Sequence, residues 1–443
     1  MDLLLALILS FLLLLFSSLK GVFIAYPLGV ALAIFVGLCW HRGFALKTLF
    51  RFGVEGIQRA FPVLSVLLLI GLVIASWMAA GTVPALVYYG LQWIHPHTFL
   101  LMAFWLTSGV SLLIGTSFGT VGTIGLALMT MAQGSDLNPH LLAGAVIAGA
   151  YVGDRCSPMS SSALLIATIT RTNLYGNLKR MWRTSGVSLL VSSLIYLALS
   201  LQHPIHLTTP SLPQDLDRVF HIQPLLLLPA LLILGLSVAQ VEVKRSMLLS
   251  TGVAIAIALF YQHHSPLQLL QFLCLGFHLE TGTSLDALLL GGGMLSMAKV
   301  SLVVMISTAF VGLFAGTRML ESIQEPLMRR TGTRNRFLTT GLVGVGTAAF
   351  GCTQTIAILL TEQLMRSKYK ESPTGNAALA LDLENTVVVI SPLIPWNIAG
   401  LVPATVLSTD AGFIPYACYL YLLPLANWLY SQLATPSKPQ LCN

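Results

Sequence analysis

Charged side chains are scarce in this chain of 443 residues, because Asp, Glu, Lys and Arg together make up only 9% of it. Soluble globular domains carry about 25%, and 56% of this sequence is hydrophobic. The longest polar stretch, residues 202–223, is too short to bury a core of its own. The sequence therefore predicts an integral membrane protein. It also lacks a long Lys/Arg run, so the net charge of +7 indicates basic loops at membrane surfaces and no nucleic-acid partner.

Paired cysteine spacings are lacking as well. The six cysteines are scattered singly along the chain, which excludes a disulfide framework and a zinc site. The apolar run 3–15 lacks a basic start and a clear small-residue cleavage site, so it is interpreted as the first span and not as a signal peptide.

What the sequence has in abundance is apolar runs of the length that crosses a bilayer, about 17–25 residues. The expected segments are 3–19, 22–40, 60–80, 99–115, 118–133, a broken 141–170, 185–201, 223–240, 246–262, 297–316, 335–351, 352–366, a broken 373–407, and 414–433. Residues 264–296 are either an extra span or a re-entrant hairpin. The predicted fold is an all-α polytopic membrane protein of about 12–14 spans.

The two halves of the chain share short patterns in the same order and at nearly the same spacing. Ala80-Gly81-Thr82 recurs as Ala315-Gly316-Thr317, and Ser157-Pro158 recurs as Ser391-Pro392. The Gly/Thr-rich break at 115–122 falls opposite 347–355. Three such matches predict an internal duplication, with one broken or re-entrant helix of each half at mid-membrane.

Basic residues predict how the two halves are oriented, because cytoplasmic loops are enriched in Lys and Arg. The segments 83–98 and 134–140 have none, whereas their counterparts 318–336 and 366–372 are basic. The loop 171–183 is basic, and its counterpart 408–413 is not. The halves are therefore expected to be inverted repeats. We expect residues 1–201 to form the first half with an extra N-terminal span, 202–222 an external linker and 223–443 the second half. Both termini are then cytoplasmic, in the plasma (inner) membrane of a prokaryote.

The first candidate site segment is the Gly/Thr-rich stretch 115–123. Its glycines loosen a helix, and the hydroxyls of Thr116, Ser117 and Thr120 with freed carbonyls are oxygen ligands of the kind a hard cation prefers. Small residues at this density also serve close helix packing. Both interpretations stay open at this stage.

The second candidate segment is Gly153-Asp154-Arg155-Cys156-Ser157-Pro158. An acidic residue at membrane depth is a functional hypothesis by default, so Asp154 is the strongest single candidate, with Ser157 as a nearby hydroxyl. The alternative is a structural ion pair between Asp154 and Arg155. Neighbours in a helix diverge in direction, which favours the functional interpretation.

The third candidate segment runs from Asp382 to Asn397. Asp382 and Glu384 face different sides of a helix, so only one is expected at the site, and Glu384 is nearer the break. The proline-rich break frees backbone groups. The further candidates are Asn385, Ser391 and Asn397 here, with Thr353 and Gln354 in the break that matches 115–123. Asn397 either caps the next half-helix or contacts substrate. Glu362 and Lys299 are expected near span ends, with their charges at the interface.

At these segments the chain resembles the NhaC-type sodium/proton antiporters of the ion-transporter superfamily. The matching pieces are 69–71 through 81–86, GTSFGTVGTIG from Gly115, GDRCSP from Gly153 and SPLIPWN from Ser391. The resemblance implies exchange of a monovalent cation against protons, without ATP or another cofactor. Asp154 and Glu384 would then hold the transported cation.

The chain also departs from the family pattern. After GDRCSP the family has an acid and threonines, whereas this chain has Ser-Ser-Ser-Ala at 160–163. Where the family has an acid before a Gln, this chain has Thr353. Where the family has an acidic pair, this chain has Glu384 and Asn385. Where the family has hydroxyl residues before SPLIPWN, this chain has Val388 and Ile390. Several oxygen ligands for sodium are therefore missing, which favours an organic substrate.

Two transport hypotheses follow, a sodium/proton antiporter and a proton- or sodium-coupled exchanger of a small carboxylate or amino acid. An enzyme is not expected: 115–119 fits the G-x-S-x-G pattern, but no histidine base with a suitable partner is predicted nearby at membrane depth. The lipid bilayer is the expected surrounding, and a homodimer is one possibility that the sequence leaves open.

Overall fold

The protein is built of helices that are interrupted at several points. The structure, a computed structural model, describes residues 2–20, 22–58, 60–93, 95–133, 135–205, 212–239, 241–278, 291–317, 336–369 and 375–433. The first half contains α1 (Asp2–Leu19), α2 (Ala25–His41), α3 (Leu46–Gln58), α4 (Phe61–Ala79), α5 (Thr82–Trp93), α6 (Phe99–Ile114), α7 (Ser117–Thr120), α8 (Leu126–Gln133), α9 (Pro139–Cys156), α10 (Ser161–Ile169) and α11 (Leu174–Gln202). Then follow α12 (Leu212–Phe220), α13 (Leu228–Val238), α14 (Val243–Phe260), α15 (Pro266–Leu275), α17 (Ala298–Thr317), α19 (Arg336–Gly351), α20 (Gln354–Tyr369), α21 (Gly375–Asn385), α22 (Val387–Ile390), α23 (Ile398–Val406) and α24 (Cys418–Leu433).

Helices that can cross a membrane confirm the polytopic all-α class. In the part of the chain that the structure describes, five helical stretches are each long and apolar enough to span, and the bent pair 375–393 with Ile398–Val406 would make a sixth. Across the described ranges the chain forms no β-strand, and its one isolated bridge joins Phe277 to Gly291. The expected count of 12–14 spans stays a prediction, because many of the expected spans are broken or shorter helices.

Most expected segments coincide with helices, but one expectation about the connections is wrong. Residues 171–183 are not a loop, because α11 begins at Leu174. The side chain of Asn173 caps this helix by accepting a hydrogen bond from the N–H of Gly176 (3.0 Å). The polar stretch 202–222 holds a short helix, α12. In the ambiguous 264–296, α15 has only 10 residues and is too short to span. The arginines between 318 and 334 and Lys370 lie outside the described residues.

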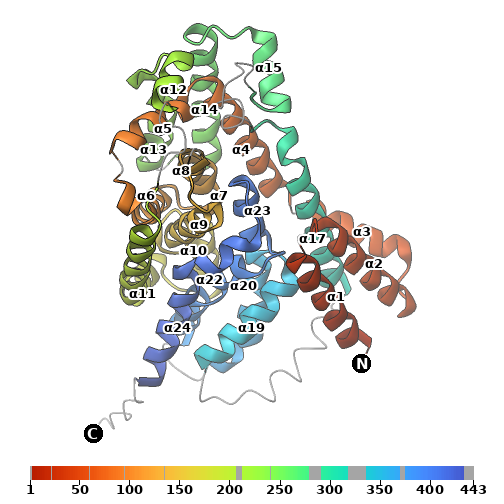
Figure 1. Ribbon diagram of the computed structural model, residues 1–443. Helices are drawn as coiled ribbons and strands as arrows, with labels where there is room; N and C mark the ends of the chain where they lie inside the picture. Colours follow the sequence, from red (N-terminus) through yellow and green to blue (C-terminus); the bar gives the residue numbers. More distant parts are fainter. Residues whose placement is uncertain are drawn as a thin grey trace.

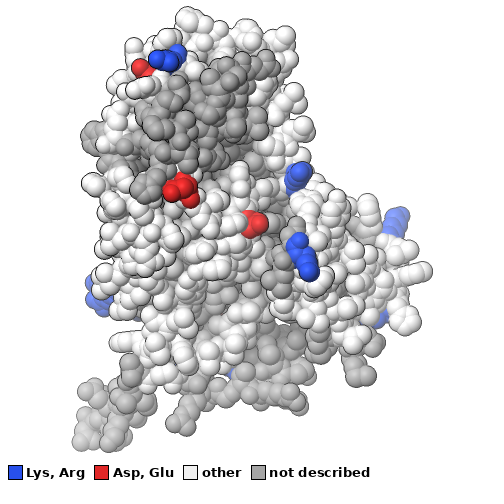
Figure 2. Space-filling model, in the orientation of Figure 1, with Lys and Arg blue, Asp and Glu red and all other residues white. Residues whose placement is uncertain are grey.

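The arrangement places α9 at the centre of the molecule. Every residue of α9 from Leu141 to Cys156 is buried, and α6 packs along it. On one side of the molecule, α2 and α3 pack against α17, and α1 packs against α2 (Figure 1). Many large apolar side chains are exposed on the outside, and the face in Figure 2 carries few charges. Such a surface suits contact with lipid.

Two helix breaks of the first half lie against each other. The α6 helix ends at Gly115, whose φ of 74° is left-handed, and the α9 helix ends at Ser157. A Cβ atom at Gly115 would come within 2.6 Å of Met159, so only glycine permits this approach. The Ser157 hydroxyl donates to the carbonyl of Leu112 (2.7 Å) and accepts from the N–H of Met159 (3.1 Å).

Two breaks of the second half make a similar contact. The α19 helix ends before Cys352, which is also left-handed with φ 52°, and α23 begins after Asn397. The N–H of Ile398 donates to the carbonyl of Cys352 (2.8 Å). The side chains of Trp396 and Asn397 donate to the carbonyls of Ala349 and Ala348, each at 2.8 Å. Side-chain hydrogen bonds thus satisfy the carbonyls freed at the end of α19.

Asn397→Ala is expected to lower the free energy of unfolding by about 1–3 kcal/mol, because it removes a helix cap and leaves a buried carbonyl unpaired. Asn397 accepts from the N–H of Ala399 (3.0 Å) while donating to Ala348. The melting temperature of detergent-solubilised protein measures the effect. The matched control is Asn138→Ala, which removes an exposed helix cap with a single hydrogen bond from the N–H of His140. This variant should lower the free energy of unfolding by less. Equal losses for the two variants would contradict the role of the Ala348 bond.

Candidate functional site

Asp154 lies where three interrupted segments meet. It sits in the last turn of α9 and is 5% exposed. The side-chain amide of Gln354, the first residue of α20, donates to its Oδ2 atom (3.2 Å). The backbone N–H of Ser117, the first residue of α7, also acts on this carboxylate. Residues from both halves of the chain therefore surround one buried acid, and the sequence had named all three.

Arg155 points away from Asp154, so the expected alternative of an ion pair between these neighbours is wrong. Its guanidinium donates to Asn385 on α21, to Thr184 (2.9 Å) and Ser185 on α11, and to the Tyr419 hydroxyl on α24 (3.4 Å). Successive residues of a helix project in directions about 100° apart, which separates the two side chains. Asp154 is consequently left with neutral partners.

Glu384 is fully buried on α21, and neither oxygen of its carboxylate has a hydrogen-bond partner among the described residues. The charged groups that act on it are Arg155 and Asp154. Among the described residues, no ion pair within 4.0 Å joins Arg155 to either acid. A buried polar group without a partner is rare and calls for an explanation. The geometry leaves Glu384 free to take up a ligand or a proton.

Several other candidates have structural bonds instead of free ligand atoms. Thr120 donates to the carbonyl of Thr116 (2.9 Å), and Ser391 donates to that of Val387 (2.7 Å). Thr353 accepts from the N–H of Ile356 (3.2 Å), and Asn397 caps α23. These residues shape the breaks. Ser117 reaches Asp154 with its backbone N–H, and its side chain interacts with Tyr151.

Tyr151 belongs to the same environment, although the sequence analysis did not name it as a ligand. Its hydroxyl donates to the carbonyl of Ala399 on α23 (2.7 Å). Its electrostatic neighbours are Asp154 and Ser117. The available signal was its spacing, since a residue three positions before Asp154 shares a helix face with it.

Two other acids are held in separate clusters. Asp382 accepts a hydrogen bond from the Tyr369 hydroxyl (2.5 Å). Glu362 is 3% exposed and pairs with Arg366 (2.5 Å), so the expectation that its charge reaches the interface is wrong. Arg366 in turn donates to the carbonyl of Ile169 at the end of α10 (3.2 Å). Lys299 is exposed, as expected.

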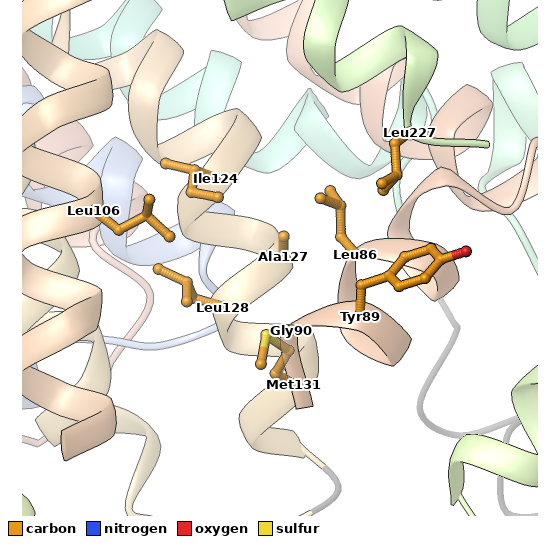
Figure 3. A pocket seen from close by; sticks show the side chains of 9 residues that line it. All are labelled: Leu86, Tyr89, Gly90, Leu106, Ile124, Ala127, Leu128, Met131 and Leu227. Carbon is orange, nitrogen blue, oxygen red and sulfur yellow. The ribbon is translucent and has the colours of Figure 1, made fainter. Parts of the chain in front are cut away.

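No second cation site is found among the described residues, either as a metal cluster or in the pocket of Figure 3. Within the described ranges, no cluster of three or more His, Cys, Asp or Glu side chains could hold a metal ion. The pocket has a volume of about 310 Å³ and no charged residue in its lining. Its lining comes from α5, α6, α8 and two neighbouring short helical turns, at Leu86, Tyr89, Gly90, Leu106, Ile124, Ala127, Leu128, Met131 and Leu227. It does not supply cation ligands.

Comparison with known proteins agrees with this geometry. The model of the Na+/H+ antiporter family matches residues 3–199 and 149–430. An uncharacterized Na+/H+ antiporter of Haemophilus influenzae is 30% identical over 407 residues, covering 89% of this chain and 87% of that protein. The Na+/H+ antiporter NhaC of Alkalihalophilus pseudofirmus is 28% identical over 386 residues, covering 86% and 84%. A malate-2H+/Na+-lactate antiporter of Bacillus subtilis is 27% identical over 425 residues, covering 93% and 88%. The resemblance to NhaC-type antiporters is confirmed, and the chain belongs to the Na+/H+ antiporter family.

Proposed function

We propose that this multi-pass membrane protein exchanges sodium for protons by alternating access, with Asp154 as the carboxylate that holds the cation and the proton in turn. Sodium/proton exchange follows from the family, and the role of Asp154 is the addition. The observation that carries it is the environment of Asp154: a buried carboxylate at the meeting point of broken helices, partnered by the neutral amide of Gln354 and not by Arg155. A carboxylate without a fixed counter-charge attracts a mobile cation.

The ligands in this proposal come from the segments around Asp154. Thr116 and Ser117 offer hydroxyl and carbonyl oxygens, which suit a hard cation. Glu384 is the second carboxylate of the site. Asn385, Thr120, Ser157, Thr353, Ser391 and Asn397 position these groups through the hydrogen bonds described above. The transported cation is a substrate of this site.

Inverted repeats are part of the proposal. Each half has a left-handed break, at Gly115 or Cys352, that contacts a second break of the same half. This similarity supports a duplication with halves 1–201 and 223–443. The start of α1 and the end of α24 lie toward the same end of the molecule, which supports cytoplasmic placement of both termini (Figure 1).

Exchange of a small organic ion is the second candidate. It is favoured by the serines at 160–162, which stand where the NhaC-type pattern has an acid and threonines. The relative from Bacillus subtilis that exchanges malate and lactate covers most of this chain. Arg155 does not offer a carboxylate site, because its two terminal nitrogens already donate to protein groups.

Reconstituted vesicles with a pH-sensitive dye distinguish the two candidates. A sodium pulse should dissipate an imposed pH gradient in vesicles with protein and leave it in vesicles without protein. Potassium, malate and lactate, each added without sodium, should have no effect. A response only when malate or lactate is present would replace the first candidate with the second.

Gln354→Leu is expected to raise the KM for sodium about tenfold, with a smaller change in kcat. The amide donates a hydrogen bond to a charged group, which contributes about 1.5–3 kcal/mol, and its loss favours the protonated form of Asp154 over the cation-bound form. Sodium-dependent initial rates in vesicles give both constants. The exposed neighbour provides the control, since Thr355→Val should leave KM unchanged. An unchanged KM in Gln354→Leu would show that the hydrogen bond plays no part in binding.

A further inference from the structure

Arg155 is a permanent charge that the scaffold holds in place. It is fully buried, and a guanidinium does not lose its proton in proteins. Its two terminal nitrogens donate to neutral groups on α11, α21 and α24, including the carbonyl of Met181 (3.3 Å). A side chain tied to three helices cannot swing out of the site during exchange without breaking these bonds. Arg155 is therefore a fixed part of the local charge.

This charge acts on Glu384, whereas the hydrogen bonds of Asp154 come from other groups. Arg155 and Glu384 interact electrostatically. The groups that hydrogen-bond to Asp154 are the Gln354 side chain and the Ser117 backbone, and Asp154 in turn interacts electrostatically with Glu384. Within the described part of the chain, the Nε atom of Arg155 and both carboxylate oxygens of Glu384 are buried without hydrogen-bond partners.

The charge of the site follows from these three residues. Two carboxylates and one guanidinium leave one net negative charge when both acids are ionised. One monovalent cation neutralises that charge. A divalent cation would leave a net positive charge in a buried, water-poor place, which is costly. Oxygen ligands alone do not provide this discrimination, because calcium also prefers oxygen.

We propose that Arg155 determines ion specificity: by offsetting Glu384, it restricts the site to a single monovalent cation and excludes divalent cations. The proposal rests on the proposed function, in which Asp154 holds the cation. It assigns Arg155 a positioning and charge-balancing role, since its two terminal nitrogens are engaged by protein groups.

The test is calcium competition against sodium-driven proton movement in vesicles. The wild type should be insensitive to calcium. Arg155→Gln should become sensitive, with half-inhibition at about tenfold lower calcium or less. Arg155→Lys retains the charge and should stay insensitive. The double variant Arg155→Gln/Glu384→Gln restores one net negative charge, and it should regain insensitivity to calcium. A merely structural role of Arg155 would not produce this rescue.

The control is Arg183→Gln, which removes an exposed charge from α11, the helix whose Thr184 and Ser185 accept hydrogen bonds from Arg155. Calcium resistance in an active Arg155→Gln variant would overturn the proposal. If Arg155→Gln does not fold, the double variant Arg155→Gln/Glu384→Gln is compared with Glu384→Gln: the net charge changes from zero to one negative charge, so the KM for sodium should fall about tenfold, and an equal KM in the two variants overturns the proposal. Wild-type vesicles without any sodium-driven proton movement would instead refute the proposed function.

Discussion

Asp154→Asn is expected to reduce sodium-driven proton movement by about 100-fold or more. Asparagine has nearly the same shape and can still meet the Gln354 amide, so the fold should survive. It cannot carry a negative charge or take up a proton. A cation in a low-dielectric site without its counter-charge loses several kcal/mol of attraction, and each 1.4 kcal/mol is a factor of ten. Initial rates of gradient dissipation in vesicles measure the loss.

The matched control for this variant is Glu55→Gln. Glu55 lies on α3 in an exposed pair with Arg51, and its side chain is 49% exposed. Neutralising it removes an acid without touching the site, so the transport rate should stay near that of the wild type. Substantial exchange by Asp154→Asn, at protein levels equal to the control, would show that another group carries the proton and the cation.

Gly153→Ala is expected to have the largest effect on folding. Gly153 lies where α9 crosses α6, and a Cβ atom there would overlap the Ser111 carbonyl and the backbone nitrogen of Leu112. Backbone cannot give way as a flexible side chain can, so the helices must separate. Overpacking costs about 1–3 kcal/mol and more where backbone must shift. The separation would also move Asp154, so transport should fall together with stability.

Gly186→Ala provides the contrast for Gly153→Ala. Gly186 is also inside a helix, but a Cβ atom there meets nothing within 4 Å. Alanine in an open helical position stabilises by about 0.5–1 kcal/mol relative to glycine. Thermal unfolding of the purified proteins in detergent should therefore move in opposite directions for the two variants. A Gly153→Ala protein as stable as the wild type would contradict the close contact between α6 and α9.

The helical breaks illustrate how much the sequence could predict. Gly115, Pro158, Pro392 and Pro395 interrupt helices for local reasons, the left-handed backbone of glycine and the missing N–H of proline. The break at Cys352 was harder to predict from the sequence, because a cysteine with a left-handed backbone has no such local signal. The expected loop 171–183 was wrong for a related reason: four basic residues indicate a membrane surface, but they are compatible with a helix that continues past it.

Composition and pattern by themselves predicted the membrane class, the two broken segments and an acid at membrane depth, Asp154, and the resemblance of short motifs predicted the family. These are local properties, since hydrophobic runs, helix breakers and motifs depend on adjacent residues. Only the tertiary structure decided which groups partner the charges. The sequence placed Arg155 beside Asp154, yet helical geometry turned it toward Asn385 and Glu384, more than two hundred positions away. Contacts between distant segments depend on how helices pack, and no local signal records that.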